Sequence, residues 1–207
     1  MRDAGCLIAF EGGEGAGKST QLRLAAAALR ARGLTVVETR EPGGTPLGAE
    51  LRRLLMHLPD APPTPLAELL LYLADRAQHV AEVIRPALAR GEVVLSDRFS
   101  ASTIAYQGHA RQLDLDTVIR LDAVARQSVA PVLTVLLDCP VDVGLRRARG
   151  DDRFHREDHA FHERVRAAFL GFAQHDPAHH AVVDATRPPE PVHHDVLTAV
   201  LRCLNLA

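Results

Sequence analysis

The chain has 207 residues, of which 47% are hydrophobic and 24% charged, and its formal net charge is −2 at pH 7. This balance argues against a disordered chain and against a generally basic nucleic-acid-binding protein, and the length suits one α/β domain. The three cysteines are widely spaced, and no N-terminal apolar run is long enough for a signal peptide or a membrane span. We therefore expect a cytoplasmic protein whose partners are small molecules, with no nucleic acid and no membrane among them.

The strongest chemical signal follows the first predicted strand, residues 7–10. Residues 12–19 match the phosphate-binding loop G-x-x-x-x-G-K-[ST]. In such a P-loop the backbone N–H groups hold phosphates, the lysine reaches the outer phosphates and the serine hydroxyl ligates Mg²⁺. Residues 12–19 contain the only lysine among the chain's 24 Lys and Arg residues. The planar guanidinium of an arginine cannot replace the compact ammonium of lysine in this loop. We expect the phosphates of ATP to be bound by Gly12, Gly13, Gly15, Ala16, Gly17, Lys18, Ser19 and Thr20.

A helix is expected directly after this loop, because Leu22, Ala25, Ala26 and Leu29 recur at helical spacing. The order of strand, loop and helix points the positive end of a helix dipole at the bound phosphates. The alternative is a glycine-rich turn that binds nothing. Such a turn does not require this order or this spacing, so we favour the nucleotide site.

Four further apolar, β-prone runs predict strands at residues 34–37, 93–95, 133–137 and 181–183. The helical patterns between and after them span residues 47–58, 66–90, 100–107, 114–128, 141–149, 159–175 and 191–204. Pro86 breaks or kinks the longest of these helices near its end. Strands that alternate with helices predict an α/β fold with a five-stranded parallel sheet flanked by helices.

Polar residues follow three of the predicted strands, at the edge where an open parallel sheet binds ligands. The first strand leads into the P-loop, the second into Arg40 and Pro42, and the third into Asp97 and Arg98. A local surface ion pair is the alternative explanation for Asp97 and Arg98. It does not explain why three such segments meet at one edge, and we expect them to form one site.

Five motifs together resemble thymidylate kinase of the bacterial type. They are FEGGEGAGKST at 10–20, TREPGGTPLG at 39–48, LADRAQH at 73–79, SDRFSASTIAYQG at 96–108 and DRFHRED at 152–158. The resemblance covers about residues 7–175. It implies a P-loop nucleoside monophosphate kinase fold, with one domain over residues 1–207 and a small lid at about 146–158. It also implies a homodimer.

The resemblance implies an activity as well: an ATP-dependent nucleoside monophosphate kinase that phosphorylates dTMP to dTDP with Mg²⁺ and supplies the dTTP pathway for DNA synthesis. Arg98 would grip the dTMP phosphate, while Asp97 and Ser19 would serve the Mg²⁺ ion. Glu14 would lie between the acceptor and the metal and ligate the metal. These roles suit a reaction that mainly requires two polyanions to be aligned and their charge to be stabilised.

The family also implies an acceptor pocket. Tyr72 and Arg76 are four residues apart on one helical face, where the aromatic ring would stack on thymine and the arginine would bond to the base. Tyr72 could otherwise be an ordinary core residue. Tyr106 would crowd the 2′ position and favour deoxyribose. The implied substrate-binding residues are Arg40, Pro42, Tyr72, Arg76, Asp97, Arg98, Thr103, Tyr106 and Gln107.

Residues 146–156 contain five arginines and coincide with the family's arginine-rich lid. A solvated helix end is the alternative interpretation. Gly15 stands where the other class of thymidylate kinase has an arginine, so the lid would supply the charge that meets the transferred phosphoryl group. Arg153 is the first candidate for this catalytic role and Arg149 the second. The chain departs from the family at His155, where glutamate is usual, and at Ala110 and Gln112, where glycines are frequent.

Three other functions remain as alternatives. The first is a P-loop kinase for another nucleotide or nucleoside, which would need a different base pocket. The second is a nucleotide-binding switch, although a chain whose only lysine is Lys18 has no N-K-x-D motif for guanine. The third is a histidine metal site among the chain's 11 histidines. We favour solvated or capping histidines, because the chain has no HExxH motif and Mg²⁺ prefers oxygen ligands.

Overall fold

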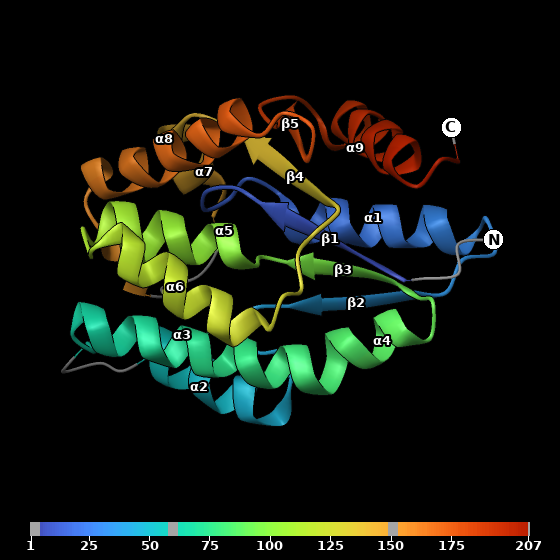
Figure 1. The fold of residues 1–207 in the computed structure, drawn as a ribbon. Coiled ribbons are helices and arrows are strands. Elements are labelled where there is room, and N and C mark those ends of the chain that lie inside the picture. The colour runs from blue at the N-terminus through green and yellow to red at the C-terminus, as the bar shows by residue number, and fades with distance from the viewer. Residues whose placement is uncertain (1–4, 58–61, 149–152, 207) are drawn as a thin grey trace.

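The structure is a computed structural model that describes residues 5–57, 62–148 and 153–206. Its centre is a parallel sheet of five strands, as predicted, in the order β2-β3-β1-β4-β5 (Figure 1). The strands are β1 (Cys6–Glu11), β2 (Val36–Arg40), β3 (Val93–Asp97), β4 (Leu133–Asp138) and β5 (His180–Asp184).

The second strand begins and ends later than predicted. Its apolar run stops at Val37, but the hydrogen-bonded ladder with β3 continues until Arg40 lies opposite Asp97. Because β2 is an edge strand, polar side chains can alternate along it without being buried on both faces. This register brings Arg40 to the same sheet edge as the P-loop.

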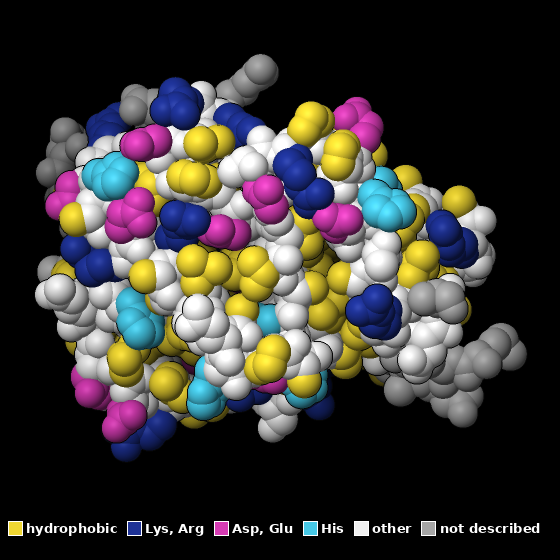
Figure 2. Space-filling model, turned by 90° about the horizontal axis from the view of Figure 1, so that it is seen from above, with side chains coloured by type: hydrophobic (Ala, Val, Ile, Leu, Met, Phe, Trp, Pro, Cys, Tyr) yellow, Lys and Arg dark blue, Asp and Glu magenta, His cyan; other side chains and the backbone are white. Residues whose placement is uncertain are grey.

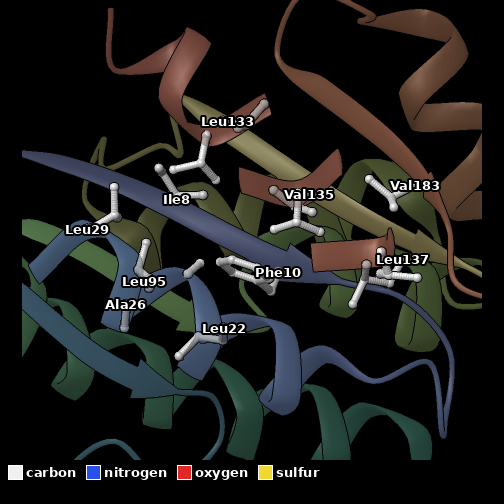
Figure 3. Close-up of a cluster of buried hydrophobic side chains, with 14 of the residues drawn as sticks. Ile8, Phe10, Leu22, Ala26, Leu29, Leu95, Leu133, Val135, Leu137 and Val183 are labelled. Atoms are coloured by element: carbon white, nitrogen blue, oxygen red, sulfur yellow. The ribbon is translucent and has the colours of Figure 1, made fainter. Parts of the chain in front are cut away.

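One face of the sheet is covered by α1 (Lys18–Arg30) and α9 (Pro189–Cys203). Ile8 and Phe10 of β1 point to this face and pack with Leu22 and Leu29 of α1 (Figure 3). Leu7 and Ala9 of β1 point to the other face. There they pack in one cluster with the helical residues Val80, Ile84 and Ala87. A strand buried on both faces requires the continuous apolar run that the sequence shows.

The other face carries α3 (Pro65–His79), α4 (Arg85–Ala89), α5 (Ser100–Thr103) and α8 (His159–His175). The long helix predicted at 66–90 does not end before Pro86. A π-helical turn, Val80–Ile84, joins α3 to α4 instead, and Pro86 lies in the first turn of α4. The wider turn accommodates a proline that lacks an N–H and crowds the preceding turn.

A second π-helical segment, Ile104–Ala110, follows α5 and carries Tyr106 and Gln107. It continues the helix predicted at 100–107 by three residues. Wide turns of this kind are frequent at functional sites. Beyond it, Gln112 has a φ of 60°, the left-handed conformation that suits the glycine frequent at this position in the resembled family.

The remaining helices are α2 (Pro46–His57), α6 (Leu115–Arg126), α7 (Val141–Arg147) and a 3₁₀ turn, Arg153–Arg156. Asp114 and Asp158 cap α6 and α8 through their carboxylates. Viewed from above, the protein shows basic and acidic side chains interspersed with apolar ones (Figure 2). Among the described helices, none combines the length and the apolar character needed to cross a bilayer.

Candidate active site

Two cavities meet at the carboxyl edge of the sheet. The P-loop cavity, of about 470 Å³, is lined by P-loop residues together with Arg40, Asp97, Arg147 and His155. The inner cavity, of about 70 Å³, extends from it toward α3 and is lined by Pro42, Met56, Tyr72, Arg76, Ser102, Thr103, Tyr106, Gln107 and Phe154. Both cavities share Glu14, Glu41, Arg52 and Arg98. The structure thus brings the predicted phosphate and acceptor residues into adjacent spaces.

The P-loop is packed so tightly that two of its glycines admit no side chain. A Cβ on Gly12 would lie 2.4 Å from the carbonyl oxygen of Leu137, and one on Gly15 would lie 1.9 Å from that of Gly144. Both residues also have positive φ angles, 142° and 66°. The loop therefore rests directly on the backbone of β4 and α7, and its N–H groups are held in place before any ligand binds.

Lys18 begins α1, and its side chain folds back along the loop. Its Nζ donates hydrogen bonds to the carbonyl oxygens of Gly12 and Gly13, at 3.0 and 2.7 Å. Burial and the nearby Arg98 lower the pKa of Lys18, and this effect outweighs the opposing influence of Glu14. Lys18 lines the P-loop cavity, and because its charge is disfavoured there without a counter-ion, an added anion would be strongly attracted.

Asp97 ends β3 directly beside the start of α1. The hydroxyl of Ser19 donates to its Oδ2 at 2.5 Å. Carboxylate and hydroxyl oxygens are the donor types that Mg²⁺ prefers. Two of the three predicted magnesium ligands are therefore in contact with each other.

The third predicted ligand, Glu14, bonds to other groups. Its Oε1 accepts from Arg98 at 2.6 Å and from the hydroxyl of Tyr106 at 3.0 Å. Burial alone would raise the pKa of this carboxyl, but the charges of Arg98 and Lys18 outweigh it and lower the pKa to about 2. Glu14 is therefore an ionised group at the boundary of the two cavities, and it is held by Arg98.

Arg98 occupies a strained position. Its φ is 76°, although it is neither glycine nor asparagine. A backbone conformation of this kind costs of order 1–3 kcal/mol, and strained residues cluster at functional sites. Its guanidinium also donates to Gly12 and Ser102, at 3.2 and 3.0 Å, and lies 5.0 Å from the centre of the Tyr106 ring. These contacts fix a planar cation between the P-loop and the inner cavity.

Aromatic rings form one wall of the inner cavity. Phe154 packs edge to face on Tyr106 with a centroid distance of 5.6 Å, and its centroid lies 6.5 Å from that of Tyr72. Burial raises the pKa of the Tyr72 hydroxyl, which therefore stays neutral. The predicted lid segment thus reaches the inner cavity through Phe154.

Arg76 lies at the centre of a buried network. Its guanidinium donates to Glu41 at 2.8 Å, to Thr103 at 2.8 Å and to Asp122 at 2.5 Å. The sequence predicted a base contact for Arg76 but none of these partners. Since Arg76 and Thr103 also line the inner cavity, the network fixes two predicted base-reading groups relative to each other.

The sequence reasoning missed the residues that hold the loop after β2. Glu41 accepts from Nδ1 of His79 at 2.8 Å, and Nε2 of His79 contacts the hydroxyl of Thr39 at 2.6 Å. Asp75 accepts from the N–H of Gly43 at 3.0 Å, and burial together with Glu41 raises its pKa to about 6. The spacing of Asp75 and His79 on one helical face was a usable signal, whereas nothing marked Glu41 as their partner.

Two more residues near the cavities were missed. Glu11 is fully buried at the end of β1 and accepts from the N–H of Phe99 at 2.8 Å and from the hydroxyl of Ser102 at 2.6 Å. Glu11 joins β1 to the start of α5. In the sequence it directly follows the apolar run of the predicted strand, and nothing there marks it as a buried hydrogen-bonding group. Arg52 of α2 lines both cavities and donates to the carbonyl of Pro42 at 3.1 Å. In the sequence it is one of two adjacent helical arginines.

Arg153, the first candidate for the catalytic lid arginine, does not line the P-loop cavity. Arg153 bonds to Glu68 of α3, and its guanidinium lies 4.9 Å from the centre of the Phe154 ring. Arg149 lies outside the described residues. Arg147 and His155 line the P-loop cavity instead.

A third space, the outer cavity of about 380 Å³, lies on the far side of the P-loop, and the sequence had not indicated it. It is lined by Gly15, Ala16, Gly17, Thr20, Gln21, Arg147, Ala185, Thr186, Arg187, Pro188, Pro189 and Val192. Arg147 is fixed along it by donating to the carbonyls of Ala185 and Thr186, at 2.6 and 2.8 Å. Within the described parts of the chain, no three His, Cys, Asp or Glu residues are grouped to hold a metal ion.

Comparison with known proteins gives consistent matches over most of the chain. The family model of thymidylate kinase matches residues 10–196. The thymidylate kinase of Geobacter sulfurreducens is 51% identical over 189 residues, which cover 87% of this chain and 89% of that protein. The thymidylate kinase of Pseudomonas fluorescens is 49% identical over 206 residues, with 98% of each chain covered. The crystal structure of thymidylate kinase from Ehrlichia chaffeensis matches with a TM-score of 0.78 and 33% identity, over 95% of this chain and 98% of that one.

Proposed function

The chain belongs to the thymidylate kinase family, and we propose that it transfers the γ-phosphoryl group of ATP to dTMP, giving ADP and dTDP. Its fold is that of the P-loop nucleoside monophosphate kinases. The observation that carries the proposal is the meeting of a P-loop cavity and a ring-lined inner cavity at Arg98 and Glu14. The phosphate groups of donor and acceptor would face each other at this boundary.

The donor nucleotide fits the P-loop and outer cavities. The loop N–H groups and the α1 dipole would hold its phosphates. Lys18 would exchange its bonds to two backbone carbonyls for the outer phosphates. The outer cavity, beyond Gly15 and Gly17, would accept the base and sugar beside the fixed guanidinium of Arg147.

The donor set beside the P-loop fits Mg²⁺. The hydroxyl of Ser19 and the carboxylate of Asp97 would hold the ion, directly or through water. When bound, Mg²⁺ neutralises charge on the donor phosphates. Glu14, the third predicted ligand, lies at the boundary with the inner cavity, where Arg98 and the hydroxyl of Tyr106 donate to its Oε1.

We assign the acceptor nucleotide to the inner cavity and to its boundary with the P-loop cavity. Arg98 would present its planar fork to the acceptor phosphate, where a guanidinium can form two parallel hydrogen bonds. Tyr72 would face the base, Thr103 and Gln107 would supply polar contacts, and Tyr106 would lie against the sugar. Arg40 and Pro42 would close the phosphate end.

The dependence of ADP formation on the acceptor tests this proposal. With ATP and Mg²⁺, we expect purified protein to form ADP rapidly with dTMP and much more slowly with dGMP, AMP or thymidine. Preference for another nucleotide would support the related-kinase alternative. ADP formation that is independent of any acceptor would identify an ATPase or a switch and contradict the proposal.

The proposed catalytic arginine of the lid is Arg153. It would have to leave Glu68 to meet charge on the transferred phosphoryl group, and Arg111 would remain paired with Glu68 after it left. We expect Arg153→Ala to lower kcat by at least about 10²-fold, with little change in the KM for dTMP, because such a contact forms only in the transition state.

Steady-state kinetics of Arg153→Ala and Arg149→Ala, measured side by side, will separate the two candidates. If both variants keep near-wild-type kcat, the lid only covers the site. A raised KM for dTMP with unchanged kcat would mean that Arg153 acts from its observed position on Glu68.

We also propose a homodimer formed through α3 and α6. Leu69, Leu73 and Val118 are buried between these helices, while Leu66 and Leu70 of α3 and Ile119 of α6 are exposed on the outer side. An exposed apolar helix pair of this kind is typical of an interface. Sedimentation should give a dimer for the wild type and a monomer for Ile119→Asp. A monomeric wild type at micromolar concentration would contradict this proposal.

A further inference from the structure

Glu68 of α3 is a buried carboxylate, 1% exposed, that connects three segments of the chain. It accepts a hydrogen bond from Nε2 of Gln107 at 2.8 Å and two from Arg111 at 3.3 Å. It also accepts from Arg153 of the lid segment. Gln107 lines the inner cavity, so Glu68 lies directly behind a predicted base-reading group.

Charge pairing keeps this carboxylate in place. Arg111 bonds to Glu157 at 2.5 Å as well as to Glu68, so two arginines and two glutamates form a neutral group. Such pairing offsets the cost of burying a carboxylate, which without partners would be several kcal/mol. Glu68 is therefore an ionised group that can only accept hydrogen bonds.

An acceptor-only partner determines which way the amide of Gln107 points. The amide has a donating NH₂ group and an accepting oxygen, and only the NH₂ group can bond to a carboxylate. Within the described ranges, Oε1 of Gln107 accepts no hydrogen bond. This oxygen is not sealed off from solvent. Its oxygen is therefore accessible from the inner cavity, which Gln107 lines.

We propose that Glu68 is a positioning residue for acceptor specificity: it fixes the Gln107 amide so that Oε1 meets an N–H group of the base. This inference rests on the proposed function. Thymine and uracil carry an imide N–H at ring position 3, where cytosine has an unprotonated nitrogen. An oxygen fixed opposite this position bonds to the first two bases and faces a second acceptor in cytosine.

The consequence is a selection that does not depend on the shape of the base. A site built to bond with an N–H group rejects a ligand that lacks it, because polar groups are left unpaired on both sides. If the amide could rotate, its NH₂ group would meet the cytosine nitrogen and selection would be lost. Glu68 prevents that rotation without touching the base.

The test is equilibrium binding of dTMP, dUMP and dCMP, measured by calorimetry on Glu68→Gln and on the wild type. A glutamine at 68 can donate or accept, so it no longer fixes the Gln107 amide. We expect the ratio of dTMP affinity to dCMP affinity to fall by at least about 10-fold. The ratio of dUMP affinity to dCMP affinity should fall in the same way, because uracil has the same imide N–H group as thymine.

Glu157→Gln is the matched control. It removes one negative charge from the same Arg111 but has no contact with Gln107. Its affinity ratio should stay within about threefold of the wild-type value. An equal fall in both variants would show that loss of charge in the group, and not the direction of the amide, controls selection, and the proposal would be wrong.

Glu68→Asp keeps the charge but withdraws the carboxylate from Gln107, and should lower the ratio in the same direction if Glu68→Gln does not fold. Wild-type selection in a folded Glu68→Gln or Glu68→Asp variant would overturn the inference and leave the proposed function intact. Wild-type protein that does not bind dTMP would overturn the proposed function itself. Binding measurements need no turnover, so the two failures are distinct.

Discussion

Lys18→Met is expected to lower kcat by about 10²–10³-fold or more, since the ammonium is directed at charge on the donor phosphates. The side chain of Lys18 donates to the carbonyls of Gly12 and Gly13, so methionine removes two hydrogen bonds. We expect a stability loss of only about 1–3 kcal/mol, because the carbonyls can still reach water in the cavity. Thermal unfolding should therefore show a folded variant.

Arg23→Met is the matched control for this prediction. Arg23 lies on the exposed side of the same helix, five residues further on, and its Nε donates to the carbonyl of Ser19 at 3.3 Å. The substitution Arg23→Met removes one positive charge from α1 and leaves the hydrogen bonds between Lys18 and the P-loop carbonyls in place. We expect near-wild-type kcat in this control. A Lys18→Met enzyme with near-wild-type kcat would mean that the P-loop assignment is wrong.

Arg98→Ala is expected to weaken dTMP far more than ATP. Losing a buried, charged hydrogen-bond partner costs about 1.5–3 kcal/mol, which is one to two decades in affinity. The guanidinium lies on the side of the P-loop that faces the inner cavity, beside Glu14 and Ser102. Calorimetric titrations with each nucleotide separately will measure the two effects, and equal weakening of both would contradict the role.

A second effect of Arg98→Ala concerns Glu14. Arg98 is the main charge that lowers the pKa of Glu14, so its removal should raise that pKa. A folded-state pKa near 2 contributes stability above the unfolded value, which is lost as pH falls through the folded value. The variant should therefore be less stable near neutral pH, and it should lose less stability than the wild type between about pH 5 and 3. Arg98→Lys, which keeps a charge but not the planar fork, should restore the neutral-pH stability and its fall in acid more fully than it restores dTMP affinity.

The sequence was sufficient for features that depend on local spacing. The P-loop is a run of eight residues whose function lies in its own backbone, and the strands of a sheet covered on both faces must be continuous apolar runs. The α/β class, the five strands and the position of Lys18 were therefore predictable. So was the gathering of Arg40, Asp97 and Arg98 at one edge, because parallel strands all end on the same side.

The tertiary structure alone decided which side chains pair. Arg76 bonds to Glu41 and Asp122, which lie 35 and 46 residues away in the chain, and Arg153 bonds to Glu68, 85 residues away. No spacing rule connects such residues, because each pair depends on how the helices, loops and turns that carry it pack and on which charges that packing buries together. A charge removed from water must find a partner wherever the fold provides one. The sequence could therefore identify Arg76 and Gln107 as residues of the acceptor site. Only the folded chain shows that Glu41 and Glu68 hold these two side chains in place.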